Sequence, residues 1–239
     1  MFRTILWFIY FWLYLIAIQP ALIKVNRLEE LGKTAEHDRL TNQTAKKWAH
    51  ALVKLAGVTV EIRGEENIPT EGSVLFVSNH QGNFDIPILL GYIDKPKAFI
   101  AKIELLKLPL IRTWMTHLKC VFMDRSDIRQ SLKVINQAAS HLKEGYSMVI
   151  FPEGTRSKSE SLGEFKPGSL KLALKAGVPI VPIAIRGSYK IMEQNGFIIK
   201  PAHVEITILE PIATAGLTKD QASELPERVR KIIIHGLSH

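Results

Sequence analysis

Cysteine is almost absent from this chain of 239 residues, and Cys120 is its only example. A single cysteine forms no intramolecular disulfide, which excludes a disulfide-stapled secreted scaffold. It also excludes zinc and iron–sulfur sites built from several thiolates. The eight histidines are scattered, and no pair has the spacing of a metal motif with a carboxylate. The sequence therefore predicts no metal site.

Several motifs of common enzyme classes are also missing. The chain contains no G-x-S-x-G, no G-x-x-x-x-G-K-[ST], no G-x-G-x-x-G and no H-E-x-x-H. These absences argue against a serine hydrolase, a nucleotide-binding enzyme and a zinc metalloenzyme. Disorder is excluded as well, because the hydrophobic fraction of 46% is ordinary for a globular protein.

The charge of the chain is basic, with 31 Lys and Arg against 23 Asp and Glu and a formal net charge of +8. Such a balance favours anionic partners such as phosphates, anionic membranes or nucleic acid. A nucleic-acid binder needs basic and aromatic side chains on one face. Here the aromatic residues are concentrated in the apolar start of the chain. We therefore expect no nucleic-acid partner.

An uninterrupted apolar and aromatic run covers residues 5–18, crosses Gln19 and Pro20 and ends at Ile23. As one helix, residues 5–23 would be about 28 Å long, close to the ~30 Å core of a bilayer. A shorter interpretation ends at Pro20 and enters one leaflet. A cleavable signal peptide is the alternative, but its apolar stretch is usually only about 7–15 residues long. We expect a retained membrane anchor.

Basic residues follow the apolar run and include Lys24, Arg27, Lys33 and Arg39. The positive-inside rule then places the rest of the chain on the cytoplasmic side of the cell membrane. Residues 35–56 show apolar side chains at helical spacing. This helix either packs its apolar stripe on the core or lies on the membrane surface. We predict membrane-docking helices over residues 1–56 and one α/β domain over residues 57–239.

The remaining chain alternates short apolar runs with helical patterns. Strands are predicted at residues 58–62, 73–78, 98–102, 120–123, 147–151, 180–185 and 204–209, and helices at 86–92, 128–143, 169–176 and 219–235. Alternating strands and helices favour an α/β fold with a mostly parallel sheet covered by helices on both faces. Ligands of such sheets bind beyond the carboxyl ends of the strands, so polar clusters there are the candidate sites.

The first such cluster contains His80 and Asp85, which follow the apolar strand 73–78. Five residues apart on a continuous helix, the two side chains would diverge by about 140°. They pair only if the chain turns between them, and Gly82 and Asn83 tolerate such a turn. A paired carboxylate would orient the imidazole and leave its other nitrogen as a base. In the alternative interpretation, Asp85 only caps the following helix.

Three further clusters follow other strands. Lys102 follows the strand 98–102, and Arg125 lies in the polar run 124–127, where Ser126 or Asp127 would cap a helix. In the segment 151–157, Gly154 allows close backbone approach and Arg156 offers a planar guanidinium suited to phosphate. Glu153 is expected to hold Arg156 or Arg125 in place.

Together these motifs resemble the glycerolipid acyltransferase family. The resemblance is carried by N-H-x-x-x-x-D at residues 79–85 and F-P-E-G-T-R at residues 151–156. The segments 101–102, 121–125 and 181–183 stand in the order and spacing of the family's other blocks. The resemblance covers about residues 57–210. The apolar start and the helix 35–56 match the membrane-docking helix pair of the family.

The resemblance implies a fatty acyl transfer from acyl-CoA or acyl-carrier protein to the sn-2 hydroxyl of lysophosphatidic acid at a phospholipid membrane, without a cofactor. His80 would act as general base and Asp85 would orient it. Lys102, Arg125 and Arg156 would bind the phosphate of the lipid, in a pocket shaped by Glu153, Gly154 and Thr155. Alternatives within reach are another acceptor, such as glycerol 3-phosphate or another lysophospholipid, and a lipid-binding protein without turnover.

Overall fold

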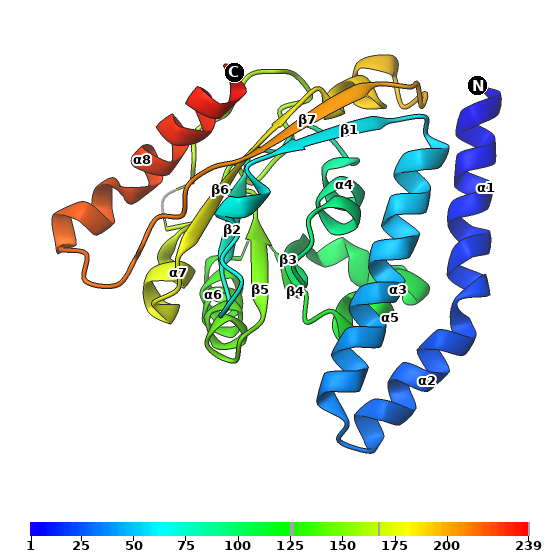
Figure 1. Cartoon of the computed structure of the whole chain (residues 1–239), viewed down its shortest axis with the longest axis horizontal. Coiled ribbons are helices and arrows are strands. Elements are labelled where there is room, and N and C mark those ends of the chain that lie inside the picture. Colours follow the sequence, from blue (N-terminus) through cyan, green and yellow to red (C-terminus); the bar gives the residue numbers. More distant parts are fainter. Residues whose placement is uncertain (125–126, 167, 239) are drawn as a thin grey trace.

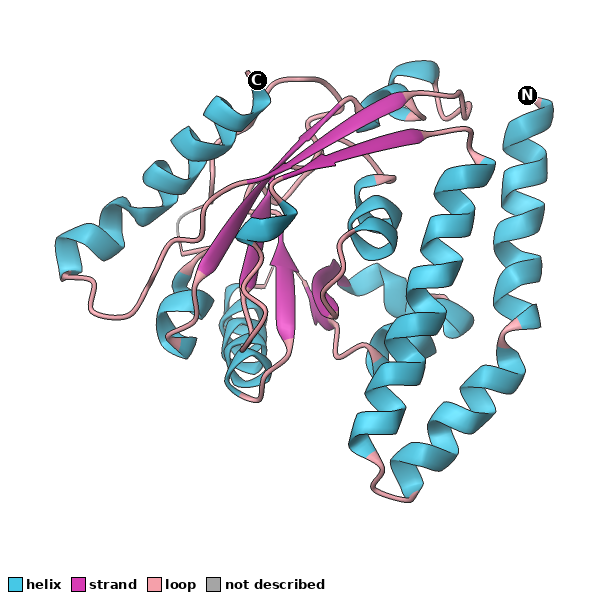
Figure 2. Cartoon of the chain, in the orientation of Figure 1, coloured by secondary structure: helices cyan, strands magenta, loops and turns pink. Residues whose placement is uncertain are grey.

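A seven-stranded sheet forms the centre of the molecule, with helices on both of its faces (Figure 1, Figure 2). The computed structural model describes residues 1–124, 127–166 and 168–238. The strands are β1 (Thr59–Arg63), β2 (Leu75–Ser78), β3 (Lys97–Lys102), β4 (Val121–Met123), β5 (Ser147–Ile150), β6 (Ile180–Arg186) and β7 (His203–Ile208). The α-helices are α1 (Phe2–Ala17), α2 (Gln19–Glu30), α3 (Thr34–Leu55), α4 (Asp85–Tyr92), α5 (Pro109–His117), α6 (Ile128–Lys143), α7 (Lys171–Ala176) and α8 (Lys219–Leu237).

The sheet is mostly parallel, as the sequence predicted. Its strand order is β1-β7-β6-β2-β5-β3-β4, and the five neighbours from β6 to β4 all run in the same direction. Strand β7 pairs antiparallel with β6, and β1 pairs parallel with β7. All seven predicted strands are present, with ends shifted by at most two residues. The carboxyl ends of five strands therefore meet at one edge of the sheet.

Two layers of helices enclose this sheet. Helices α6, α7 and α8 lie on one side, while α4 lies on the other with α3 packed against it and α1 and α2 outside α3 (Figure 1). Because both faces are covered, the strands β2 and β5 are buried at every position. Parallel strands covered on both sides read as continuous apolar runs, which is the pattern that revealed them in the sequence.

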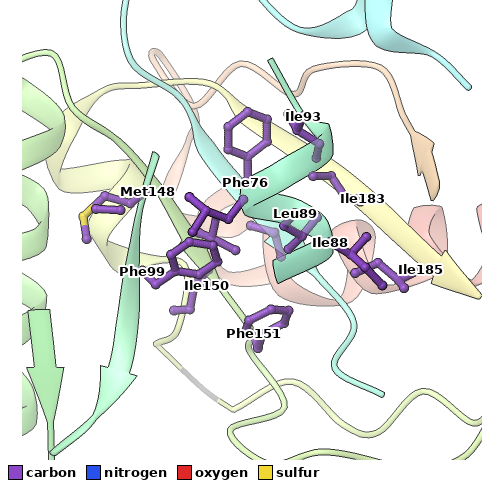
Figure 3. Packing of buried hydrophobic residues seen from close by; sticks show 14 of the residues in the cluster. Phe76, Ile88, Leu89, Ile93, Phe99, Met148, Ile150, Phe151, Ile183 and Ile185 are labelled. Carbon is purple, nitrogen blue, oxygen red and sulfur yellow. The ribbon is translucent and has the colours of Figure 1, made fainter. Parts of the chain in front are cut away.

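Helix α4 is anchored to the sheet by fully buried side chains. Ile88 and Leu89 lie close to Phe76 of β2 and Ile183 of β6, and none of the four is exposed (Figure 3). Each such side chain contributes about 1.5–3 kcal/mol of burial free energy. The loop from Asn79 to Phe84 is thus held between two elements that cannot shift relative to each other.

Helix α3 packs into the domain core. Its side chains Ala49, Leu52 and Val53 are buried in the same cluster as the sheet. A Cβ atom on Gly91 of α4 would lie 2.8 Å from the backbone nitrogen of His50, so only glycine permits this close approach of α3 and α4. Of the two interpretations of the segment 35–56, packing of its apolar stripe on the core is confirmed.

The apolar start of the chain forms two helices. Helix α1 ends at Ala17, and α2 begins at Gln19 with Pro20 in its first turn. A proline has no backbone N–H to continue the hydrogen-bonding ladder, and this interrupts the helix. Among the described residues, no single helix has the length and apolarity of a membrane span; α1 and α2 reach them only as a pair bent by 42°. Of the two interpretations of the apolar run, one continuous helix over residues 5–23 is therefore not what the structure shows, and the first helix ends before Pro20.

Candidate functional site

The candidate site lies at the carboxyl edge of the parallel strands. Strand β2 ends at Ser78, and the loop that carries His80 follows directly. The neighbouring strand β5 ends at Ile150, before the segment that carries Arg156. On the other side of β2, strand β6 ends at Arg186. The polar residues that follow these strands are consequently brought to one place by the sheet.

His80 and Asp85 form a hydrogen-bonded pair at the centre of this site. The imidazole Nδ1 of His80 lies 2.7 Å from Oδ2 of Asp85. The backbone N–H groups of Gln81 and Gly82 also donate to this oxygen, at 2.7 Å and 2.9 Å. The chain therefore turns between the two residues, as required for pairing. The carboxylate accepts a hydrogen bond from Nδ1–H. Nε2 is therefore the unprotonated nitrogen of the neutral ring.

Asp85 is fully buried and accepts hydrogen bonds at both of its oxygens. It is the first residue of α4, where the helix dipole stabilises a negative charge. The hydroxyl of Ser188 donates to its second oxygen, Oδ1. Of the two interpretations of Asp85, the structure shows the histidine partner: the side chain makes no capping hydrogen bond to α4, whose N-cap is Phe84. One carboxylate fastens the loop, the helix and the imidazole.

The imidazole of His80 is also fixed by its remaining neighbours. Its ring stacks on Phe151, with centroids 4.0 Å apart and planes inclined by 18°. Its backbone N–H donates to Glu153 at 2.7 Å, and its carbonyl accepts from the N–H of Ser157 at 2.8 Å. The side chain is 15% exposed, and Nε2 has no hydrogen-bond partner among the described residues. The ring therefore presents one nitrogen to an incoming molecule.

Glu153 lies behind His80 and fastens two loops. Its carboxylate accepts from the backbone N–H groups of His80 and Gly163, at 2.7 Å and 2.8 Å. Burial raises the pKa of Glu153, and the two N–H donors oppose this shift. Glu153 does not hold Arg156, whose guanidinium is bound by Asn83 and Glu193 instead, and the alternative partner Arg125 lies outside the described residues. Glu153 thus fixes the shape of the two loops at this site.

Arg156 is held by two residues that follow different strands. Its Nη1 donates to Oδ1 of Asn83 at 2.5 Å and to Oε1 of Glu193 at 3.2 Å. The Glu193 side chain is only 1% exposed and also accepts from the N–H of Asn83 at 2.7 Å. A Cβ atom on Gly82 would lie 2.4 Å from Oε2 of Glu193, so the carboxylate fills the space above this glycine. Arg156 remains 31% exposed and can still reach a ligand.

The other predicted site residues lie around this centre. Lys102 ends β3, two strands and about 10 Å from β2, and its exposed ammonium group pairs with Glu104 at 2.6 Å. Gly154 has a φ of +71°, a conformation that favours glycine, and the Lys166 side chain lies where its Cβ atom would be. Thr155 is exposed beside it. Arg125 lies outside the described residues, and Asp127 caps α6 as expected.

Several residues that build the site belong to no pattern that assigns them a role from the sequence. Ser188 follows β6 directly, so the search beyond strand ends finds it when applied to this strand as well. Asn79 joins β2 to β6, because its side chain exchanges two hydrogen bonds of 2.8 Å with the backbone of Ile185. Glu193 lies in a short 3₁₀ helix (Glu193–Asn195), where no pattern marks it. Each of these residues contacts a partner more than 100 residues away in the sequence.

Comparisons with known proteins agree with this geometry. Residues 59–186 match the family described as Acyltransferase. A probable 1-acyl-sn-glycerol-3-phosphate acyltransferase of Mycoplasma pneumoniae is 43% identical over 59% of this chain and 54% of its own length. The 1-acyl-sn-glycerol-3-phosphate acyltransferase of Escherichia coli is 30% identical over 76% of this chain and 74% of its own length. The chain thus spans about half of the first relative and three quarters of the second.

A solved structure extends the similarity to nearly the whole chain. The 1-acyl-sn-glycerophosphate (LPA) acyltransferase PlsC of Thermotoga maritima superimposes with a TM-score of 0.82 at 27% identity. The superposition covers 99% of this chain and 97% of that one. The matched segment 59–186 contains His80, Asp85 and all predicted phosphate-binding residues.

Proposed function

We propose that this chain, which belongs to the acyltransferase family, transfers a fatty acyl group from acyl-CoA or acyl-carrier protein to the sn-2 hydroxyl of 1-acyl-sn-glycerol 3-phosphate. The product is phosphatidic acid. One observation carries the proposal: Nδ1 of His80 is bound to the buried carboxylate of Asp85, while Nε2 faces outward from the carboxyl edge of the sheet. The names of the relatives supply the substrate class.

In this proposal His80 is the general base. Its Nε2 takes the proton of the acceptor hydroxyl as the oxygen attacks the thioester carbonyl. A new C–O bond forms, the C–S bond breaks, and the proton passes from the imidazolium to the leaving thiolate. Asp85 stabilises the imidazolium during the reaction without being protonated. A thioester is reactive enough for direct transfer, so the proposal needs neither a covalent acyl-enzyme nor a cofactor.

The basic residues of the site are proposed to bind the phosphate of the lipid. Arg156 is held by Asn83 and Glu193 with part of its guanidinium exposed, and a planar guanidinium suits a phosphate. Lys102 and Arg125 complete the proposed set. Glu153, Gly154 and Thr155 shape the loop around it. Two substrates held at one base gain much of their rate from positioning.

Helix α1 supports docking to a phospholipid membrane. One face of it exposes large apolar side chains, namely Phe2, Ile5, Ile9, Trp12, Leu13 and Ile16. A soluble monomer rarely exposes so much contiguous apolar surface. The net charge of +8 would attract an anionic leaflet and anionic acyl donors. We propose that residues 1–56 dock to the cell membrane, with the α/β domain on the cytoplasmic side.

The proposal is tested by acyl transfer in detergent micelles with a labelled long-chain acyl-CoA. Lysophosphatidic acid and glycerol 3-phosphate are offered in parallel, with the His80→Ala protein as control. Phosphatidic acid made from the first acceptor, and only by the intact protein, is the expected result. Product from glycerol 3-phosphate alone overturns the acceptor assignment. Product only with acyl-carrier protein identifies the donor, and no product with either donor favours a lipid-binding protein without turnover.

A further inference from the structure

A second histidine cluster lies at the opposite edge of the sheet from His80. It contains Glu29 near the end of α2, His37 in the first turn of α3 and His117 at the end of α5. One ligand atom of each lies within 4.8 Å of the other two. The spacing along the sequence predicted no metal site, but the three residues come from three helices and meet only in the fold.

The distances in this cluster fit a tetrahedral metal site. His37 Nε2 lies 3.1 Å from His117 Nδ1, which in turn lies 3.6 Å from a carboxylate oxygen of Glu29. Zinc–nitrogen and zinc–oxygen bonds of about 2.0–2.2 Å place neighbouring tetrahedral ligands about 3.3–3.6 Å apart. The third pair, His37 and Glu29, lies within 4.8 Å, so the three side chains can reach one ion after small shifts.

The surroundings of His37 match those of a metal-bound histidine. Its Nδ1 donates to Oδ1 of Asp38 at 2.8 Å, which leaves the lone pair of Nε2 directed at the cluster. Tyr146 lines the same cleft as the Asp38 carboxylate. A carboxylate bound to the outer ring nitrogen fixes the tautomer and raises the basicity of a metal-binding histidine. His37 is only 4% exposed, so water does not compete for it.

His117 is the member of the cluster that also lines a small cleft beside it. The cleft has a volume of about 40 Å³ and is also lined by Asp38, Asn42, Lys97 and Tyr146. This volume exceeds the ~10–15 Å³ that one water molecule needs.

We propose that Glu29, His37 and His117 bind a divalent transition-metal ion of the zinc type, with a solvent water molecule from the exposed Glu29 side as fourth ligand. The ion replaces the proton shared by the two facing nitrogens, and His117 then carries its proton on Nε2. It ties the helices α2 and α3 to α5, away from the carboxyl edge. Its role is structural, and the proposal is independent of the acyl transfer.

The test uses the full chain without a histidine tag, purified in detergent and stripped with EDTA. Calorimetry with ZnCl₂ should give one bound ion per chain, and CoCl₂ should give the visible absorption bands of a four-coordinate site. Zinc should raise the thermal unfolding temperature, and EDTA should reverse this rise. MgCl₂ and CaCl₂ should have no effect, because imidazole ligands favour zinc over these hard cations.

Three variants locate the ion. His117→Gln should abolish stoichiometric binding, and Glu29→Gln should weaken it. Asp38→Asn should weaken zinc affinity about 10- to 100-fold through His37. The control is His203→Gln, an exposed histidine 3.5 Å from Glu61, which should bind zinc like the parent protein.

The outcomes decide the proposal even if a buried variant fails to fold. Glu29 is 56% exposed, so Glu29→Gln should fold and report on the site. Binding that is unchanged in Glu29→Gln and Asp38→Asn, or lost in His203→Gln, would show an adventitious ion only and overturn the proposal. Less than one zinc per chain, or six-coordinate cobalt bands in the parent protein, would also overturn it.

Discussion

Two histidines of this protein have the same carboxylate contact and different surroundings. His80 Nδ1 lies 2.7 Å from Asp85, and His37 Nδ1 lies 2.8 Å from Asp38. In both rings the carboxylate leaves Nε2 as the unprotonated nitrogen. The Nε2 atom of His80 has no partner among the described residues, whereas that of His37 faces His117. The group opposite Nε2 therefore distinguishes the proposed general base, His80, from the proposed metal ligand, His37.

The two carboxylates also differ in how firmly they are held. Asp85 is 0% exposed, receives two backbone N–H groups and the Ser188 hydroxyl, and begins a helix. Asp38 is 27% exposed and lies within α3. A carboxylate that must stabilise an imidazolium needs this fixed environment. A carboxylate that only orients a metal-bound imidazole, the role proposed for Asp38, does not need such a fixed environment.

The largest expected effect is that of His80→Ala. Loss of the general base should lower the rate of acyl transfer about 10²- to 10⁴-fold. The measurement is turnover with labelled acyl-CoA and lysophosphatidic acid, with circular dichroism as a check of folding. His203→Ala, which removes an exposed histidine, is the control. Near-normal turnover of His80→Ala would show that another group acts as base.

Asp85→Asn should lower turnover about 100-fold or more, because the amide neither fixes the tautomer nor stabilises the imidazolium. The matched change Asp38→Asn should act on zinc affinity instead. Measuring both quantities in both variants tests whether the two histidine centres are separate. A loss of zinc binding in Asp85→Asn would contradict that separation.

Arg156→Ala should raise KM for lysophosphatidic acid about 10- to 100-fold, as expected for a hydrogen bond to a charged group. KM for the acyl donor should change much less, because the proposal places Arg156 on the lipid phosphate. Initial rates with each substrate varied in turn give both constants. The opposite pattern would assign Arg156 to the phosphates of the donor.

Ser188→Ala should lower the free energy of unfolding by about 1–3 kcal/mol, because it leaves Oδ1 of Asp85 buried without a donor. Tyr146→Phe removes a hydroxyl from the cleft that Asp38 also lines. Because the Asp38 carboxylate is partly hydrated, this change should lower the free energy of unfolding by less. Urea denaturation of the two variants compares them directly. Equal losses would mean that the burial of the carboxylate is not what matters.

Lys97, at the same edge as His37, provides an effect that depends on pH. Burial lowers its pKa from 10.5 to about 7, with Lys46 lowering it further and Asp94 opposing. The unfolded chain binds more protons between these values, so stability rises with pH from about 7 to 10.5 by up to about 1.4 kcal/mol per unit. Lys97→Met should flatten this rise in urea denaturation at several pH values. An unchanged slope would assign the rise to other groups.

The sequence predicted the sheet well because buried parallel strands are continuous apolar runs. The pairing of His80 with Asp85 was one of two interpretations of the local pattern and was implied by the family resemblance. The structure shows this pairing. The sequence patterns missed α5, where Pro109 begins a helix of mixed polarity. The contacts of Glu193 with Asn83 and of His37 with His117 span 110 and 80 residues. Such contacts depend on how the layers pack, which local patterns do not encode.

The contact of Gly82 with Glu193 restricts the order in which these positions can change. The φ of Gly82 is not in the left-handed region, so its backbone would accept a larger residue; only the Glu193 carboxylate occupies the space. Gly82→Ala made first displaces a buried carboxylate and releases Arg156 from it. After Glu193→Ala the same change meets no such obstacle. The two substitutions are therefore non-additive, and mutational paths that reach the double variant pass through position 193 first.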